Sequence, residues 1–203
     1  AHHADPHPGY NLLSNPYAAA IDWYAPEGWS GRDCLLAEDK QAYVAWKWSD
    51  EARNFAAMDL RSHLKNHNGA GGYIAPMEGF WVQARRDSHG CLLGLDQRAF
   101  WQAPAKGHDA MHARPGTLRL RLVSDFGHDE LILESGHGSA SRTPKMMSLC
   151  PEAPQIYARD ALGGYSILME SSLEDKYETD IVVLPGSGQN LCLHLDGSLT
   201  STH

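Results

Sequence analysis

The stretch that decides the fold is Gly9-Tyr10-Asn11-Leu12-Leu13-Ser14-Asn15-Pro16-Tyr17, continued by Ile21-Asp22-Trp23. Its first part mixes polar and apolar residues in a way that is compatible with a half-buried strand. The strand is expected to end at Asn15-Pro16, because Asn bonds its own backbone in turns and Pro cannot donate to a β-ladder. The aromatic residues that follow the turn need a core on which to pack.

A second stretch with similar chemistry is Tyr73-Ile74-Ala75-Pro76-Met77-Glu78-Gly79-Phe80-Trp81-Val82-Gln83-Ala84. It also carries a Pro and a Gly within a strand-like run. We interpret the two stretches as the framework of one β-domain. The run is expected to form a hairpin with 91–95 across the turn at 85–90.

The clearest strand is Thr117–Val123, in which Leu118, Leu120 and Leu122 alternate with polar residues. Such alternation is typical of a strand with one wet face. It should pair with Asp129–Glu134 across the turn at 125–128. Further strands are predicted at 43–48, 145–149, 155–158, 165–169, 180–184 and 190–195.

Two connecting segments have other interpretations. Residues 51–64 could form one or two helical turns, or a polar excursion between strands. Residues 135–144 are rich in Gly and Ser and are expected to be a mobile loop. About ten short strands separated by turns predict an all-β fold: an antiparallel β-sandwich, jelly-roll-like, with at most one or two short helices. Residues 1–8 would be a flexible lead and residues 9–203 a single domain.

Composition excludes some classes of protein. The formal net charge is −8, with 17 Lys and Arg scattered over 203 residues. Binding to nucleic acid needs a dense basic stripe, which this sequence lacks. No run approaches the roughly 20 apolar residues that span a bilayer.

Four cysteines stand far apart, at Cys34, Cys91, Cys150 and Cys192. They form no CxxC pair, which excludes a zinc ribbon or a thioredoxin-like motif. One or two disulfides, or four small buried thiols, are both compatible with this spacing. The pairing stays open.

The two framework stretches resemble a family of exported bacterial proteins. Gly9–Trp23 resembles the "GWNLIGNPYPSPIDW" stretch of secreted and cell-surface proteins of Bacteroidetes-type bacteria, which commonly leave by type IX secretion. Ile74–Val82 resembles that family's "IPPMQGFFVKA" stretch, and Tyr43–Trp48 stands where the family has a "YVW" strand. Weaker matches are 118–122 to "LRLRL", Pro144-Lys145 to a lysine-containing turn, and 155–157 to "PQIY".

The resemblance implies a β-sandwich module near the C-terminal end of a larger exported protein, usually just before a sorting domain. It implies a non-catalytic, secreted or cell-surface module for adhesion, scaffolding or display. Its partners would be other domains of the parent protein, cell-surface groups or glycans. Tyr10 and Ser14 depart from the family's Trp and Gly. The family offers no shared catalytic residues.

Residues of the framework are expected to shape a corner of the sandwich rather than to bind a ligand. Asn15 and Asp22 can hydrogen-bond the backbone, and Pro16 fixes φ. The residues with this expected structural role are Asn11, Asn15, Pro16, Asp22, Pro76 and Gly79.

Carbohydrate binding is the alternative function, because indole and phenol rings stack on sugar rings. The candidates are Trp29, Tyr24 and Trp48. Trp29 lies between Gly28 and Gly31 in an expected loop, which makes it the best candidate for an exposed ring.

A metal-dependent hydrolase is the more distant alternative. His63 and His67, and likewise His108 and His112, have the i, i+4 spacing of paired ligands on a helix. No HExxH signature accompanies them, so solvated loop histidines are the simpler interpretation. We expect no cofactor, with calcium at the sandwich loops left open. Carboxylate pairs such as Asp129-Glu130 could serve a glycosidase only if they faced each other across a cleft.

Overall fold

The computed structural model describes residues 9–35, 43–62, 66–85, 90, 92–102, 116–135, 141–161, 163–170, 179–188 and 190–198. These residues form β-strands, three 3₁₀ helices of three residues each, and no α-helix. The all-β prediction is therefore confirmed, although the short helices number three instead of one or two. The expected lead at 1–8 lies outside the described residues.

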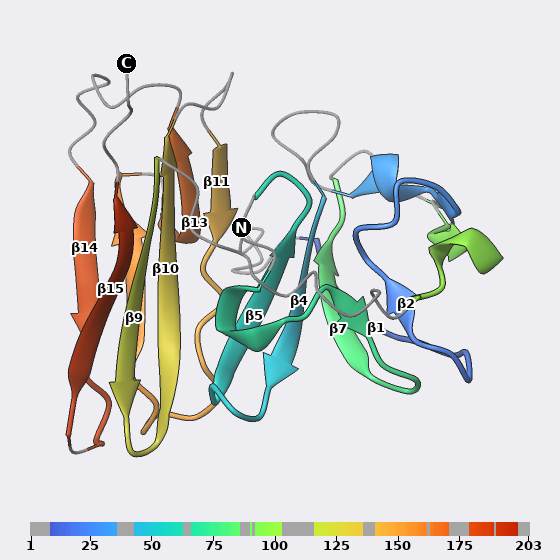
Figure 1. Cartoon of the computed structure of the whole chain (residues 1–203). Helices are drawn as coiled ribbons and strands as arrows, with labels where there is room; N and C mark the ends of the chain where they lie inside the picture. Colours follow the sequence, from blue (N-terminus) through green and yellow to red (C-terminus); the bar gives the residue numbers. More distant parts are fainter. Residues whose placement is uncertain are drawn as a thin grey trace, which may run out of the picture.

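Two large sheets carry the structure, as Figure 1 shows. The first sheet is formed by β1 (Tyr10–Ser14), β7 (Gly79–Gln83), β4 (Val44–Ser49) and β5 (Asn54–Asp59), in that order. The second has the order β14 (Asp180–Leu184), β12 (Gln155–Arg159), β13 (Gly164–Glu170), β10 (Gly127–Ser135), β9 (Thr117–Ser124), β15 (Cys192–Ser198), with β11 (Ser141–Pro144) paired to β13. Two small ladders pair β2 (Ile21–Asp22) with β6 (Tyr73–Ile74), and β3 (Trp29–Ser30) with β8 (Gly94–Leu95).

The two framework stretches are direct neighbours. β1 and β7 pair antiparallel from Tyr10 opposite Gln83 to Ser14 opposite Gly79. Their continuations pair again, because Ile21 of β2 lies opposite Ile74 of β6. The framework inferred from the sequence is therefore confirmed.

Apolar side chains fill three layers. The first cluster covers one face of the first sheet and includes Ile21, Trp23, Met58, Ile74 and Phe80. The second lies between the two sheets and joins Val44, Trp46, Phe55 and Ala57 to Ile132, Ile167 and Met169. The third lies on the other face of the second sheet and includes Leu120, Leu122, Leu131, Ile156 and Leu168. The first sheet thus has an apolar cluster on each of its faces.

Strands β9 and β10 form the predicted hairpin, with Leu120 opposite Leu131. β10 and β13, however, run parallel, with Ile132 opposite Ile167, whereas a purely antiparallel sandwich was expected. Parallel neighbours need a long crossover, and the chain between them supplies one that includes β11 and β12.

Four local predictions were wrong. Residues 54–59 form strand β5 rather than a helical turn, and every residue of that strand is buried. Burial on both faces removes the alternation by which a strand is recognised. The hairpin with 91–95 does not form, because β7 lies between β1 and β4 while β8 pairs with β3. The strand expected at 145–149 is absent, and β11 occupies the end of the expected mobile loop.

Asn15 fixes the corner after β1. Its side chain is fully buried, and Nδ2 lies 2.9, 3.1 and 3.0 Å from the carbonyl oxygens of Ala19, Ile74 and Ala75. Its Oδ1 accepts from the amide of Tyr17 at 3.0 Å. One amide group therefore ties the turn to the other framework stretch.

The remaining corner residues act more locally. Asp22 accepts from the amide of Tyr24 at 2.8 Å. Asn11 is exposed and reaches the carbonyl of Gly9 at 2.8 Å. Pro16 is exposed at the turn, and Pro76 precedes Met77, whose φ of 62° marks a tight turn.

Replacing Asn15 by Asp should destabilise the fold strongly, because a carboxylate has the same shape but no donor for the carbonyls. We expect the free energy of unfolding in urea at pH 7 to fall by about 2–4 kcal/mol. Asn11→Asp is the matched control and should change it by less than about 0.5 kcal/mol. Equal effects at the two positions would show that Asn15 does not hold the corner.

Candidate functional site

His67 is the only histidine of the two spaced pairs within the described residues, since His63, His108 and His112 lie outside them. It begins the 3₁₀ helix η2 (His67–Gly69) and is fully buried. Nδ1 accepts from the amide of Ala57 at 3.0 Å, and Nε2 lies 2.8 Å from the carbonyl oxygen of Glu130, to which it donates. With both nitrogens engaged by the backbone, this imidazole is a structural group that joins β5 to β10.

The described ranges contain no group of three or more His, Cys, Asp or Glu side chains arranged to hold a metal ion.

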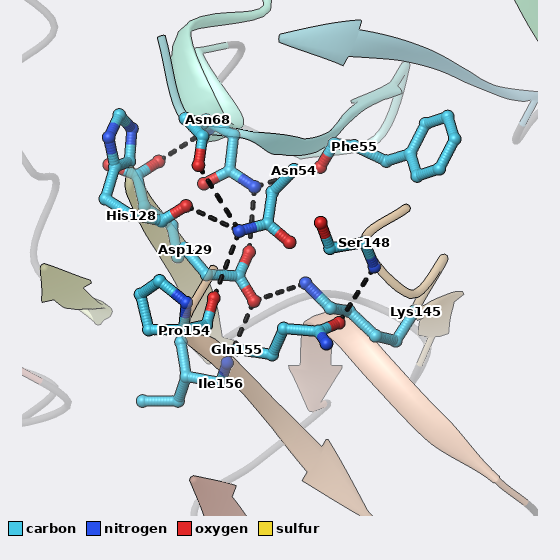
Figure 2. Close-up of polar contacts among 12 residues, drawn as sticks. Asn54, Phe55, Asn68, His128, Asp129, Lys145, Ser148, Pro154, Gln155 and Ile156 are labelled. Atoms are coloured by element: carbon cyan, nitrogen blue, oxygen red, sulfur yellow. Dashed lines mark hydrogen bonds and ion pairs between the residues drawn. The ribbon is translucent and has the colours of Figure 1, made fainter. Parts of the chain in front are cut away.

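A buried polar junction lies where the two sheets meet, and we define it by Asn54, Asn68, Asp129 and Lys145 (Figure 2). Asp129 is its centre and is fully buried. Oδ2 forms an ion pair with Lys145 Nζ and accepts from the amide of Ile156 at 2.8 Å. Oδ1 accepts from Asn68 Nδ2 at 2.8 Å. The carboxylate is therefore satisfied by donors from three separate parts of the chain.

The asparagines of the junction cross-link backbone segments. Asn54 Nδ2 donates to the carbonyl of His128 at 2.8 Å and to that of Pro154 at 3.0 Å (Figure 2). Asn68 also donates from Nδ2 to the carbonyl of Phe55 at 2.9 Å. Asn68 adopts φ of 47°, a left-handed conformation that asparagine tolerates better than most residues. The junction thus links β5, η2, β10 and the start of β12.

Asp129 and Glu130 do not form an open catalytic pair. Both side chains are buried, and Glu130 Oε2 accepts from the amide of Asn68 at 2.7 Å. Burial raises the pKa of the Glu130 carboxyl, while the nearby Arg119 guanidinium acts in the opposite direction. The two carboxyls serve internal contacts rather than facing each other across a cleft.

The structure does not bring the three candidate sugar-stacking aromatics together. Tyr24 and Trp29 pack against the first apolar cluster, whereas Trp48 packs against the second, on the other face of the first sheet. Trp29 lies edge-on to Trp23, 5.2 Å between centroids, and its indole N–H donates to the carbonyl of Asp22.

Trp48 is held in a similar way. It lies edge-on to Phe55, and its indole N–H donates to Asp50. All three residues are partly buried, and each ring packs against one of the apolar clusters.

An apolar row marks each free margin of the second sheet. Ile181 and Val183 lie on β14 at one end of the strand order, and Leu193 and Leu195 lie on β15 at the other end. We call these four residues together the open edge, and each pair one half of it. Ile181 and Val183 on β14 lie opposite Ala158 and Ile156. On β15, Leu193 and Leu195 lie opposite Leu122 and Leu120. Cross-strand partners share a face, so both rows continue the third apolar cluster outward, one at each margin of the sheet.

The open edge is unusually apolar for a free sheet margin. Its four side chains are 42–66 % exposed. β14 and β15 end the strand order, and in the part of the chain that the structure describes each pairs on one side only. Free edges are commonly protected by Lys or Pro, and neither residue occurs in β14 or β15. This edge therefore has the properties of an interaction surface.

Sequence reasoning missed the polar junction and the open edge. The residues of the junction are single polar residues within or beside strands, and no motif connects them. The sequence gives one weak indication of the apolar row on β15, because Leu191, Leu193 and Leu195 alternate with other residues. Alternation does not show, however, whether other parts of the protein cover that face of the strand.

No protein-family model matches the chain, and neither curated proteins nor solved structures provide a match. None of the helices in the described ranges has the length and apolar character needed to cross a membrane.

The burial of His67 predicts a pH dependence of stability. Desolvation lowers its pKa from 6.5 to about 4 in the folded protein. Because the unfolded chain takes up the proton at higher pH, the free energy of unfolding should fall as the pH drops from about 6.5 to about 4. The contribution of this residue is on the order of 3 kcal/mol over that window.

Urea unfolding of the wild type and of His67→Gln, at a series of pH values, measures this contribution. The variant should be less stable at neutral pH and should show a flatter decline on acidification. The exposed His194→Gln serves as control and should retain the decline of the wild type. A decline that persists unchanged in His67→Gln would assign it to other groups.

Lys145→Met should destabilise the protein at neutral pH, because it leaves the Asp129 carboxylate buried without its cation. The side chain of Lys145 is 2 % exposed, and removing one partner of such a pair costs about 3–5 kcal/mol. Arg159→Met is the matched control, since its pair with Asp180 is exposed and worth less than about 1 kcal/mol. Denaturation midpoints that shift equally in the two variants would contradict the proposed role of the junction.

Proposed function

We propose that this chain is a non-catalytic, extracellular or cell-surface β-sandwich module that serves adhesion, scaffolding or display within a larger protein. The observation that supports it is the open edge, where apolar side chains of two unprotected strands stay half-exposed. Such a surface is suited to binding another polypeptide rather than to converting a small molecule.

The occupant we propose for the open edge is β-structure from a neighbouring domain of the parent protein. An added strand would pair with the free backbone groups of β14 and cover Val183, or with those of β15 and cover Leu193. Main-chain pairing supplies affinity, and alternate apolar side chains supply register.

The burial and internal pairing of the titratable side chains also favour a non-catalytic role. Asp129, Lys145 and His67 combine acid, base and nucleophile chemistry in one region, yet each is buried and engaged by internal partners. Buried groups that are already satisfied stabilise a fold and offer nothing to a substrate.

Placement outside the cytoplasm is supported by the cysteines. Cys34 is disulfide-bonded, while Cys150 and Cys192 are free. Disulfides persist mainly in oxidising compartments. The type IX export route follows from the resemblance of the two framework stretches.

Hydrogen exchange tests the proposed docking. Amide exchange in β14 and β15 should be fast in the isolated chain and clearly slower in the full-length parent protein, while exchange in β4 should match in both. In the parent, Leu193→Lys should restore fast exchange in β15 and Val183→Lys should restore it in β14, at whichever margin the strand docks. Leu12→Lys, an exposed control on β1, should change neither. Equal exchange of β14 and β15 in the two proteins would refute docking at this edge.

A further inference from the structure

A pocket of about 420 Å³, lined mainly by residues with charged side chains, lies on the second sheet, on the face opposite the third apolar cluster. It is lined by Arg119, Arg121, Val123, Glu130, His194 and Asp196. The register explains this grouping, because β9 lies between β10 and β15. Arg121 has Glu130 on one side and His194 on the other, and Arg119 has Asp196 beside it.

The two arginines alternate with the leucines of β9, so both guanidinium groups belong to the same face of the strand. They are a local concentration of positive charge in a chain whose formal net charge is −8. The pocket volume falls within the range of roughly 300–1,000 Å³ that is typical of small-molecule sites.

Arg119 has unused donors. Within the described residues its guanidinium donates no hydrogen bond, and its closest carboxylate contact is Nη1 to Glu130 Oε1 at 3.6 Å. The Nε atoms of Arg119 and Arg121 are buried and lack hydrogen-bond partners. Arg121 Nη2 lies only against the ring of His128, at 3.1 and 3.2 Å. The buried Nε atoms are out of reach of a ligand, but the terminal Nη atoms of Arg119 are not buried and donate no hydrogen bond within the described residues. Guanidinium groups usually bind carboxylates through such nitrogens, so these Nη atoms are placed for an acceptor that comes from outside.

Glu130 cannot supply that acceptor in the present geometry. Its Oε2 is held by the amide of Asn68 at 2.7 Å, and its Oε1 is shared between the two arginines at 3.6 and 3.8 Å. Because Glu130 is 3 % exposed, it partly neutralises the arginines without filling the space in front of them. His194 and Asp196 of β15, by contrast, are exposed and provide a rim of hydrogen-bonding groups.

We propose that this pocket binds an acidic sugar, with the ligand carboxylate on Arg119 and Arg121 and its ring hydroxyls on Asp196 and His194. The carboxylate uses the paired donors of the guanidinium groups. Asp196 accepts hydrogen bonds, and a uronate carries several hydroxyl donors on the same ring as its carboxylate, whereas the carboxylate of an Asp or Glu side chain has no hydroxyl beside it. The ligand is therefore a uronate rather than an acidic peptide.

This inference is independent of the proposed docking at the open edge, which uses the opposite face of the same sheet. A failed test of edge docking would not affect the proposed uronate site, and a failed test of uronate binding would not affect the proposed docking. If both hold, the module attaches to its parent through one face and presents a site for acidic glycans on the other.

Titration calorimetry of the 203-residue chain with galacturonate and glucuronate oligosaccharides tests the inference. We expect saturable binding of at least one uronate series and at least about tenfold weaker binding of the neutral galactose and glucose counterparts. Arg119→Gln should weaken binding by at least about tenfold, and Arg159→Gln, an exposed arginine outside the pocket, should leave it unchanged. Circular dichroism and urea midpoints close to wild type verify that each variant is folded.

Three results would overturn the inference. The first is absence of uronate binding up to about 10 mM ligand, the weak end of specific recognition. The second is binding that Arg119→Gln and Arg121→Gln leave unchanged. The third is tighter binding of oligoglutamate than of the uronates, which would assign the pocket to an acidic peptide.

Discussion

The ion pair between Asp129 and Lys145 is the constraint on which the rest of the structure depends. Burying two charges costs several kcal/mol each, and their attraction offsets this cost only when the remaining lone pairs are also satisfied. Here the amide of Ile156 and the side chain of Asn68 complete the carboxylate. Such a site tolerates few other arrangements of the segments that meet there.

The position of the pair explains how the two sheets are joined. Lys145 follows β11, Asp129 belongs to β10, and Asn68 reaches over from the segment after β5 (Figure 2). The second apolar cluster begins beside this point and fills the space between the sheets. Apolar packing supplies most of the stabilisation, and the polar junction selects one relative placement of the sheets. The junction also holds the beginning of β12, the strand that pairs with β14. It therefore positions the half of the open edge that lies on β14.

Much of the fold was predictable from the sequence, and the reasons are local. The turn at Asn15-Pro16 and the alternation of Leu118, Leu120 and Leu122 depend on residues close together in the chain. β5 was missed because both of its faces are buried, so its sequence lacks a period of two. The parallel pairing of β10 with β13 depends on a crossover, and no local pattern encodes a crossover.

The functional surfaces were harder to predict, for a physical reason. Tyr24, Trp29 and Trp48 have the right chemistry for sugar binding, but tertiary packing uses their rings in two different cores. Arg119 and Arg121 were read only as the polar residues of an alternating strand. Whether such residues line a pocket depends on β15, which lies far along the chain. A sequence shows which side chains a protein has, but the pairing of its strands decides which of those side chains remain accessible to a ligand.

The central claim is that the buried junction makes the two sheets one cooperative unit. Native-state hydrogen exchange of the wild type and of Asp129→Asn tests it most directly, with β4 reporting on the first sheet and β13 on the second. We predict that both strands exchange with the same opening free energy in the wild type, and that β13 opens at a lower free energy than β4 in the variant. Independent opening of the two strands in the wild type would contradict the claim.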